Sequence, residues 1–205
     1  MNLSEGEAAA ISHLCGEPVL EIDEVLLGRN NRSKCVETLN HSFFIKHYFK
    51  HEQDPRDRLT TEFSFLQFLN GQGVAGIPST LFKDAQNSFA VYSYIRGDSI
   101  LDLSESHVDQ AMHFLASANE CRDSIDAQGL AAASEACFSA DEYLDNLRVR
   151  FQRLDDFCAV DEADFLAKQF LNETLTPALN ELCAKGYLEF VVGQAERVLS
   201  PSDFG

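Results

Sequence analysis

The feature that most constrains this chain is the stretch 42–50, where side chains alternate with a two-residue period. Phe43 and Ile45 fall on one face together with His47, and Lys46 falls on the other face between two aromatic residues. This alternation predicts a half-buried β-strand. A lysine between aromatic residues is often an ordinary surface residue whose stem lies along the rings, so the pattern alone assigns it no function.

Two further strands are expected before this one, over residues 18–27 and 34–39. A polar, basic turn at residues 28–33 and a tight turn at residues 40–41 connect the three segments. Short connections of this kind join antiparallel neighbours, so the pattern predicts a three-stranded antiparallel meander. A short helix is expected ahead of it, over residues 5–15, which are rich in alanine.

The period then changes from two to that of a helix. Asp54 is expected to cap this helix, and Pro55 suits its first turn. Apolar residues follow at helical spacing, at Leu59, Phe63, Leu66 and Leu69. Glu62 lies beside this apolar stripe. Two more strands are expected at residues 80–83 and 88–95.

After Gly97 the pattern is helical almost to the end of the chain. Ser139 is a candidate helix cap, and Pro177 should kink or split the helix that contains it. The expected helices and short strands are 105–119, 140–158 and 162–185, then 188–192 and 197–199. The sequence therefore predicts an α+β fold in two parts, a sheet-built domain over residues 1–97 and a helical one over residues 98–205.

The formal net charge of −17 argues against binding to bulk nucleic acid or to an anionic membrane surface. The charge is uneven, because residues 28–58 carry a net charge of +3 and residues 101–170 one of −10. A basic segment followed by an acidic one fits an anionic ligand held by the first part. The alternative is that most of these carboxylates form a solvated helical surface.

The six cysteines are scattered, with no C-x-x-C pair. This spacing argues against a cysteine metal cage or a disulfide framework and favours a reducing cytoplasm. The first residues are acidic and polar, unlike a secretory signal, and no apolar run is long enough to span a bilayer.

The order of the elements has a chemical logic. The phosphates of a nucleotide need fixed positive charge and backbone N–H groups. The turn at Gly28 can supply N–H groups, and Lys46 can supply the charge from a strand that follows it. Glu62, 16 residues after Lys46 on a helix, can hold the lysine by an ion pair.

Several stretches of the chain resemble the aminoglycoside-phosphotransferase-like kinases. The resemblance covers residues 19–100 and 197–205. It rests on these segments, together with Glu62: Gly28–Arg32, Phe44–Phe49, Asp54–Leu59, Tyr92–Gly97 and Leu199–Gly205.

This resemblance implies a protein-kinase-like bilobal fold, with an N-terminal antiparallel sheet lobe and a mainly helical, incomplete C-terminal lobe. It also implies transfer of the γ-phosphoryl group of ATP, with Mg²⁺, to a hydroxyl of a small molecule such as a sugar or an amino compound. Lys46 would hold the α- and β-phosphates, and Glu62 would anchor Lys46. The remaining implied nucleotide contacts are the loop residues Gly28, Asn30 and Asn31, and the backbone of Ser93, Tyr94 and Ile95 at the adenine edge.

The same resemblance makes Asp203 the catalytic-loop aspartate that accepts the proton of the attacking hydroxyl. The family pattern then places an asparagine and the magnesium ligands beyond Gly205, so that the chain stops inside its own active site. Three alternatives stay open at this point. Asp203 is a plain loop residue, or the metal ligand of a protein kinase, although no H-R-D motif precedes it; or the chain is a catalytically inactive, pseudokinase-like binding or scaffold module.

Overall fold

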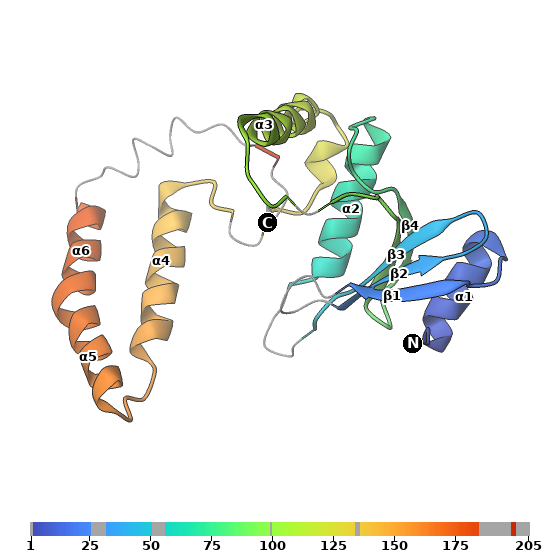
Figure 1. The fold of residues 1–205 in the computed structure, drawn as a ribbon. Helices are drawn as coiled ribbons and strands as arrows, with labels where there is room; N and C mark the ends of the chain where they lie inside the picture. The colour runs from blue at the N-terminus through green and yellow to red at the C-terminus, as the bar shows by residue number, and fades with distance from the viewer. Residues whose placement is uncertain are drawn as a thin grey trace. The chain divides into compact units, whose positions relative to one another are not determined.

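The computed structural model describes residues 2–25, 32–50, 56–98, 100–133, 136–184 and 198–199. These residues form two compact units, one that runs to Ala131 and includes Leu199, and one within residues 132–198 (Figure 1). The predicted domain boundary near Gly97 is a different division of the chain and stays a prediction. Each unit is described separately below.

The first unit is built on a five-stranded antiparallel sheet with the strand order β1-β2-β3-β5-β4 (Figure 1). Its strands are β1 (Glu21–Val25), β2 (Arg32–Glu37), β3 (Ser42–His47), β4 (Thr80–Asp84) and β5 (Phe89–Ser93). The predicted meander and the two later strands are therefore confirmed. β3 ends three residues earlier than predicted, because its neighbour β5 begins at Phe89, directly opposite His47.

One helix packs on each face of this sheet. On the first face, α1 (Glu5–Cys15) covers an apolar cluster that includes Ile45 and Val91. On the second face, α2 (Arg58–Gly71) packs against Tyr92 and its neighbours. Because successive residues of a strand point to opposite faces, Lys46 lies on the α2 face. Alternate side chains of β3 thus face α1 on one side of the sheet and α2 on the other.

The start of α2 differs from the prediction. Asp57 caps the helix, since its carboxylate accepts a hydrogen bond from the backbone N–H of Thr60 at 3.0 Å. Asp54 and Pro55, which were expected to begin the helix, lie outside the described residues. The predicted apolar stripe is confirmed, with Leu59 and Leu69 at most 2% exposed.

The helix α3 (Glu105–Glu120) packs on the end of α2 through a third apolar cluster. Asn119 joins this cluster to Leu199 by two hydrogen bonds, one accepted from the N–H of Leu199 at 2.8 Å and one donated to its carbonyl at 3.0 Å. A strand was predicted at residues 197–199. The structure describes two of these residues, Val198 and Leu199, and neither is in a strand. The side chain of Asn119, and not a neighbouring strand, makes the hydrogen bonds to the backbone of Leu199. The other predicted late strand, residues 188–192, lies outside the described residues.

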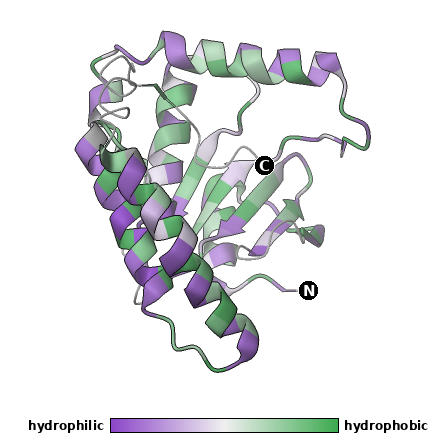
Figure 2. Ribbon diagram, turned by 90° about the vertical axis from the view of Figure 1, so that its left-hand side faces the viewer, coloured by the Kyte–Doolittle hydropathy of each residue, from purple (hydrophilic) through white to green (hydrophobic). Residues whose placement is uncertain are grey.

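The second unit contains α4 (Ala140–Asp155), α5 (Glu162–Phe170) and α6 (Thr176–Ala184). Ser139 caps α4, as predicted, by accepting a hydrogen bond from the N–H of Glu142 at 3.1 Å. The long helix predicted over residues 162–185 is split between α5 and α6 by a wide π-helical turn, Leu171–Leu175. Pro177 follows this turn and has no N–H for a carbonyl four residues earlier, so the predicted break is confirmed. Hydrophobic and hydrophilic residues alternate along these helices (Figure 2).

None of the helices in the described parts of the chain has both the length and the hydrophobicity that a membrane span requires. All six cysteines are described, and none of them forms a disulfide. The reducing cytoplasm expected from their spacing, and the absence of a nucleic-acid partner, stay predictions.

Candidate nucleotide-binding site

Lys46 and Glu62 meet on the α2 face of the sheet. The ammonium Nζ of Lys46 lies 2.8 Å from each carboxylate oxygen of Glu62. The two side chains are 21% and 31% exposed, so the pair is neither buried nor freely solvated. The ion pair predicted from the order of strand and helix is therefore present. It fixes the end of a long, flexible side chain at the surface of the sheet, with its charge still accessible from one side.

Two tyrosines lie beneath this ion pair. The ring centroid of Tyr48 is 5.1 Å from Nζ of Lys46, within cation–π range. The hydroxyl of Tyr48 is hydrogen-bonded to the hydroxyl of Tyr92 at 2.7 Å, and both residues are buried. Burial, with the nearby Glu62 carboxylate, raises the pKa of both phenols, so they stay neutral. Sequence reasoning placed Tyr48 beside Lys46 but missed Tyr92, because the contact depends on the pairing of β3 with β5.

We expect either Tyr48→Phe or Tyr92→Phe to lower the free energy of unfolding by about 1–2 kcal/mol, because each leaves the other hydroxyl buried without its partner. The double variant should cost less than the sum of the two, since it removes both hydroxyls together. Urea unfolding of the four proteins gives the coupling. Additive losses would show that the two hydroxyls do not interact in solution.

The segment after β5 supplies a different set of groups. The N–H of Ser93 donates to the carbonyl of Ser79 at 3.0 Å, and the N–H of Tyr94 donates to the carbonyl of Ser42 at 3.1 Å. The side-chain oxygen of Ser93 also accepts a hydrogen bond from the N–H of Ser79. By contrast, the N–H of Ile95 has no hydrogen-bond partner among the described residues. Of the three residues predicted to meet the adenine edge, only Ile95 therefore has an N–H available for a ligand.

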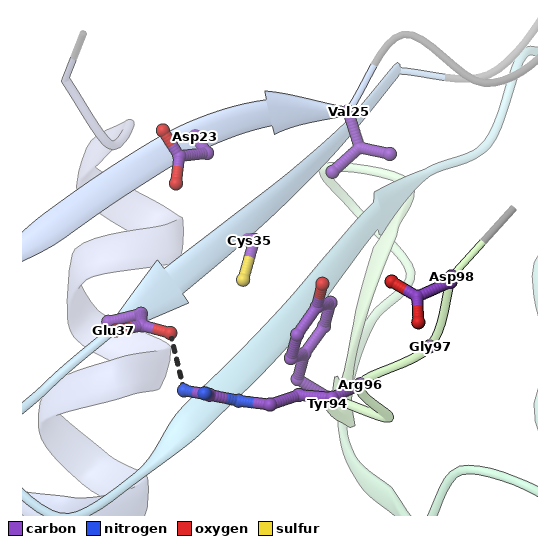
Figure 3. A pocket seen from close by; sticks show the side chains of 8 residues that line it. All are labelled: Asp23, Val25, Cys35, Glu37, Tyr94, Arg96, Gly97 and Asp98. Carbon is purple, nitrogen blue, oxygen red and sulfur yellow. Dashed lines mark hydrogen bonds and ion pairs between the residues drawn. The ribbon is translucent and has the colours of Figure 1, made fainter.

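An open pocket lies where β1 and β2 face this segment (Figure 3). Its volume is about 640 Å³, and its lining residues are Asp23, Val25, Cys35, Glu37, Tyr94, Arg96, Gly97 and Asp98. Arg96 reaches across it to Glu37, with 3.2 Å between guanidinium and carboxylate. Burial, reinforced by the carboxylates of Glu37 and Asp23, raises the pKa of the Cys35 thiol, so this group is neutral.

The pocket and Lys46 share one face of the sheet, although Lys46 does not line the pocket. Cys35 is paired with Phe44, and Lys46 is paired with Ser33, so these residues point to the same side. The two pairs are two residues apart along the strands, about 7 Å. The sheet thus presents a pocket beside the segment after β5 and a fixed ammonium further along the strands. Except for residues of the segment after β5, sequence analysis did not single out the pocket residues, because they converge only through strand pairing.

Four of the predicted site residues, Gly28, Asn30, Asn31 and Asp203, lie outside the described residues. The connection that contains the first three leaves the sheet at Val25 and re-enters it at Arg32. Val25 is paired with Ser33, which is itself paired with Lys46. The connection therefore joins the ends of β1 and β2 that lie nearest to Lys46.

No protein-family model matches this chain, and no curated protein matches it in sequence. Among solved structures, it is similar to spectinomycin phosphotransferase in complex with ADP and spectinomycin, with a TM-score of 0.59 and 14% sequence identity, over 99% of this chain and 63% of that one. It also matches choline kinase from Cryptosporidium parvum, with a TM-score of 0.49 and 14% identity, over 76% of this chain and 42% of that one. The chain thus spans less than two thirds of the length of these proteins.

The similarity to spectinomycin phosphotransferase shows that the chain has a kinase-like fold. The α+β fold class and the resemblance to the aminoglycoside-phosphotransferase-like kinases are confirmed at this level. At 14% identity, the comparison supports a shared fold but no shared substrate or residue role. The roles of individual residues rest on the geometry described above.

Proposed function

We propose that this chain is the nucleotide-binding part of an ATP-dependent phosphotransferase that acts on a hydroxyl of a small molecule. The observation that carries the proposal is the ion pair of Lys46 and Glu62, on the same face of the sheet as the pocket beside Ile95. A nucleotide needs a polar slot for its base and a fixed cation for its phosphates, at two ends of one surface. The sheet offers both.

At the base end, the N–H of Ile95 is the donor available to the acceptor edge of adenine. Carbonyl groups of the same segment are the acceptors for its amino group. The N–H groups of Ser93 and Tyr94 hold the segment to the sheet and do not face the ligand in this proposal. The base is thus read by backbone groups on a rigid segment, as expected for a nucleotide site.

At the phosphate end, Lys46 contacts the α- and β-phosphates while Glu62 keeps its ammonium in place. The residues Gly28, Asn30 and Asn31 belong to the connection that joins β1 and β2 at this end, and in this proposal their N–H groups add to the phosphate contacts. Asp203 is the group that accepts the proton of the attacking hydroxyl. Mg²⁺ would neutralise charge on the transferred phosphoryl group.

The base end can be tested apart from the phosphates with adenosine as the ligand. We expect Ile95→Pro, which removes the backbone N–H, to weaken adenosine binding by about tenfold, in line with the loss of one hydrogen bond of about 1–1.5 kcal/mol. Ile95→Ala is the matched control, since it shortens the side chain and keeps the N–H, and it should bind adenosine nearly as well as the wild type. Isothermal titration calorimetry measures all three proteins.

Equal adenosine affinity for Ile95→Pro and the wild type would show that the N–H of this segment does not contact the base. Binding of ATP together with an absence of phosphoryl transfer to hydroxylated acceptors would favour the non-catalytic binding module over the enzyme.

A further inference from the structure

Three side chains of the kinds that bind metal ions meet at the end of α1, apart from Lys46 and Glu62. Cys15 is the last residue of α1, Glu17 follows two residues later, and His41 lies in the turn between β2 and β3. A thiol sulfur, a carboxylate oxygen and an imidazole nitrogen from these residues all lie within 4.8 Å of one another. His41 immediately precedes β3, whereas Lys46 lies near the other end of that strand, so the cluster is separate from the phosphate end of the proposed site.

The local backbone explains why Cys15 and Glu17 lie close together. Gly16 ends α1 in the left-handed conformation, with φ of 67°, and its N–H donates to the carbonyl of Ser12. This C-cap turns the chain sharply, a conformation that glycine adopts without strain. Glu17 is thereby directed to the β2–β3 turn while Cys15 stays on the last turn of the helix.

The turn between β2 and β3 holds the carboxylate of Glu17 in a fixed position. One oxygen accepts hydrogen bonds from the hydroxyl of Thr38 at 2.7 Å and the backbone N–H of Asn40 at 3.0 Å. The other oxygen accepts one from the side-chain amide of Asn40 at 2.7 Å. These hydrogen bonds hold the carboxylate in one orientation.

The imidazole of His41 is oriented as well. Its ring is stacked on Phe43, with centroids 5.8 Å apart and planes 16° apart. Its Nδ1 lies 3.3 Å from a carboxylate oxygen of Glu17. Two oxygen or nitrogen ligands on a tetrahedral zinc ion, each about 2.0–2.1 Å from the metal, are separated by roughly this distance. Two of the three ligands are thus already spaced for one ion.

We propose that Cys15, Glu17 and His41 bind a zinc ion, with water in the fourth position. A mixed set of thiolate, imidazole and carboxylate suits zinc better than magnesium or calcium, which prefer oxygen ligands alone. The Cys15 thiol now donates to the carbonyl of Ile11 at 3.4 Å; on binding it loses its proton to the solvent and turns its sulfur to the metal. Asn40 and Thr38 are the outer hydrogen-bond partners that hold the carboxylate ligand.

Such an ion would join the end of α1 to the turn that leads into β3. Zinc that binds the folded chain and not the unfolded one raises stability by mass action, so the melting temperature should rise with zinc concentration. The role we infer is therefore structural, a link between a helix and a turn that no covalent bond connects.

The test uses the untagged full chain, freed of metal and kept reduced. Titration with Co²⁺ alone should give a one-to-one complex with a sulfur-to-metal charge-transfer band and the strong visible bands of tetrahedral cobalt, which Zn²⁺ then displaces. Cys15→Ser should lose the charge-transfer band and bind Zn²⁺ at least about tenfold more weakly, together with the zinc-dependent rise in melting temperature. His41→Gln should also weaken Zn²⁺ binding.

Cys121→Ser is the matched control. Cys121 lies at the end of a helix, like Cys15, and donates its thiol to a carbonyl four residues earlier, that of Ser117, but no group of metal-binding side chains surrounds it in the described part of the chain. This variant should keep the band and the zinc affinity of the wild type. The proposal is overturned if the wild type gives no charge-transfer band, or if the band survives in Cys15→Ser.

Discussion

Replacing Lys46 with methionine is expected to weaken ATP binding by about 10- to 100-fold and to leave the free energy of unfolding almost unchanged. The loss follows from removing a charged contact to phosphate, which contributes about 1.5–3 kcal/mol. Stability should change little, because Glu62 is 31% exposed and water can solvate its carboxylate once the partner is gone. Calorimetric titration with ATP and urea unfolding measure the two quantities separately.

The matched control is Lys34→Met. Lys34 is also on a central strand and also forms an ion pair with a helical carboxylate, that of Glu7 at 2.8 Å, but on the opposite face of the sheet. Lys34→Met should therefore lose about 2–4 kcal/mol of stability and bind ATP with the affinity of the wild type under conditions where it is folded. If the two variants bound ATP equally well, Lys46 would have no part in the site and the proposed function would lose its main support.

A large loss of stability is also expected at Glu7, where Glu7→Gln should lower the free energy of unfolding by about 3 kcal/mol. The Glu7 side chain is 1% exposed and lies between the ammonium of Lys34 and the imidazole of His47, 2.8 Å from Nζ of Lys34 and 2.9 Å from Nε2 of His47. It also accepts the N–H of Ser4 and so completes the capping box of α1. The neutral amide keeps the shape of the side chain but leaves its charged partner without a counter-charge.

The same residue should give the protein a distinct acid sensitivity. Burial raises the pKa of Glu7, but hydrogen bonds from His47, Lys34 and Ser4 together lower it from 4.5 to about 2. A folded-state pKa below the unfolded value contributes stability that is fully present above pH 4.5 and is lost as the pH falls towards 2. The difference corresponds to about 3 kcal/mol.

Urea unfolding between pH 7 and pH 2.5 checks this prediction. The wild type should lose stability steeply below about pH 4.5, and Glu7→Gln should lose about 3 kcal/mol less over the same range. Glu5→Gln is the control, because Glu5 lies in the same helical turn but is exposed, and it should follow the wild type. Parallel pH profiles for all three proteins would show that Glu7 is not held as a buried carboxylate.

Much of the candidate site was predictable because it depends on periodicity. The alternation in β3 places Lys46 on one face, and the apolar stripe of α2 places Glu62 beside that face. A strand and a helix that follow each other closely in the chain tend to pack together, so the ion pair could be expected from the sequence. The helix break near Pro177 was predictable for a similar reason, since it follows from the chemistry of one residue.

The parts that escaped prediction depend on distant partners or on competition between similar residues. Tyr92 comes to lie beneath the ion pair through the pairing of β5 with β3 and β4, which no local pattern specifies. His47 was visible as the polar exception on an apolar face, but its partner Glu7 is 40 residues away in the sequence. Asp54 and Asp57 are equally good caps by composition, and only the hydrogen bond to Thr60 identifies Asp57.

The alternation of β3 has one more consequence. Ile45 and His47, the two neighbours of Lys46 along the strand, both point to the far side, where Ile45 belongs to the core under α1 and His47 contacts Glu7. The backbone of Lys46 is therefore anchored from behind by contacts that take no part in binding a nucleotide. In the proposed site the ammonium would therefore be preorganised for a phosphate, and little conformational entropy would be lost on association. The contacts on the far face of the sheet would then set how precisely Lys46 is positioned.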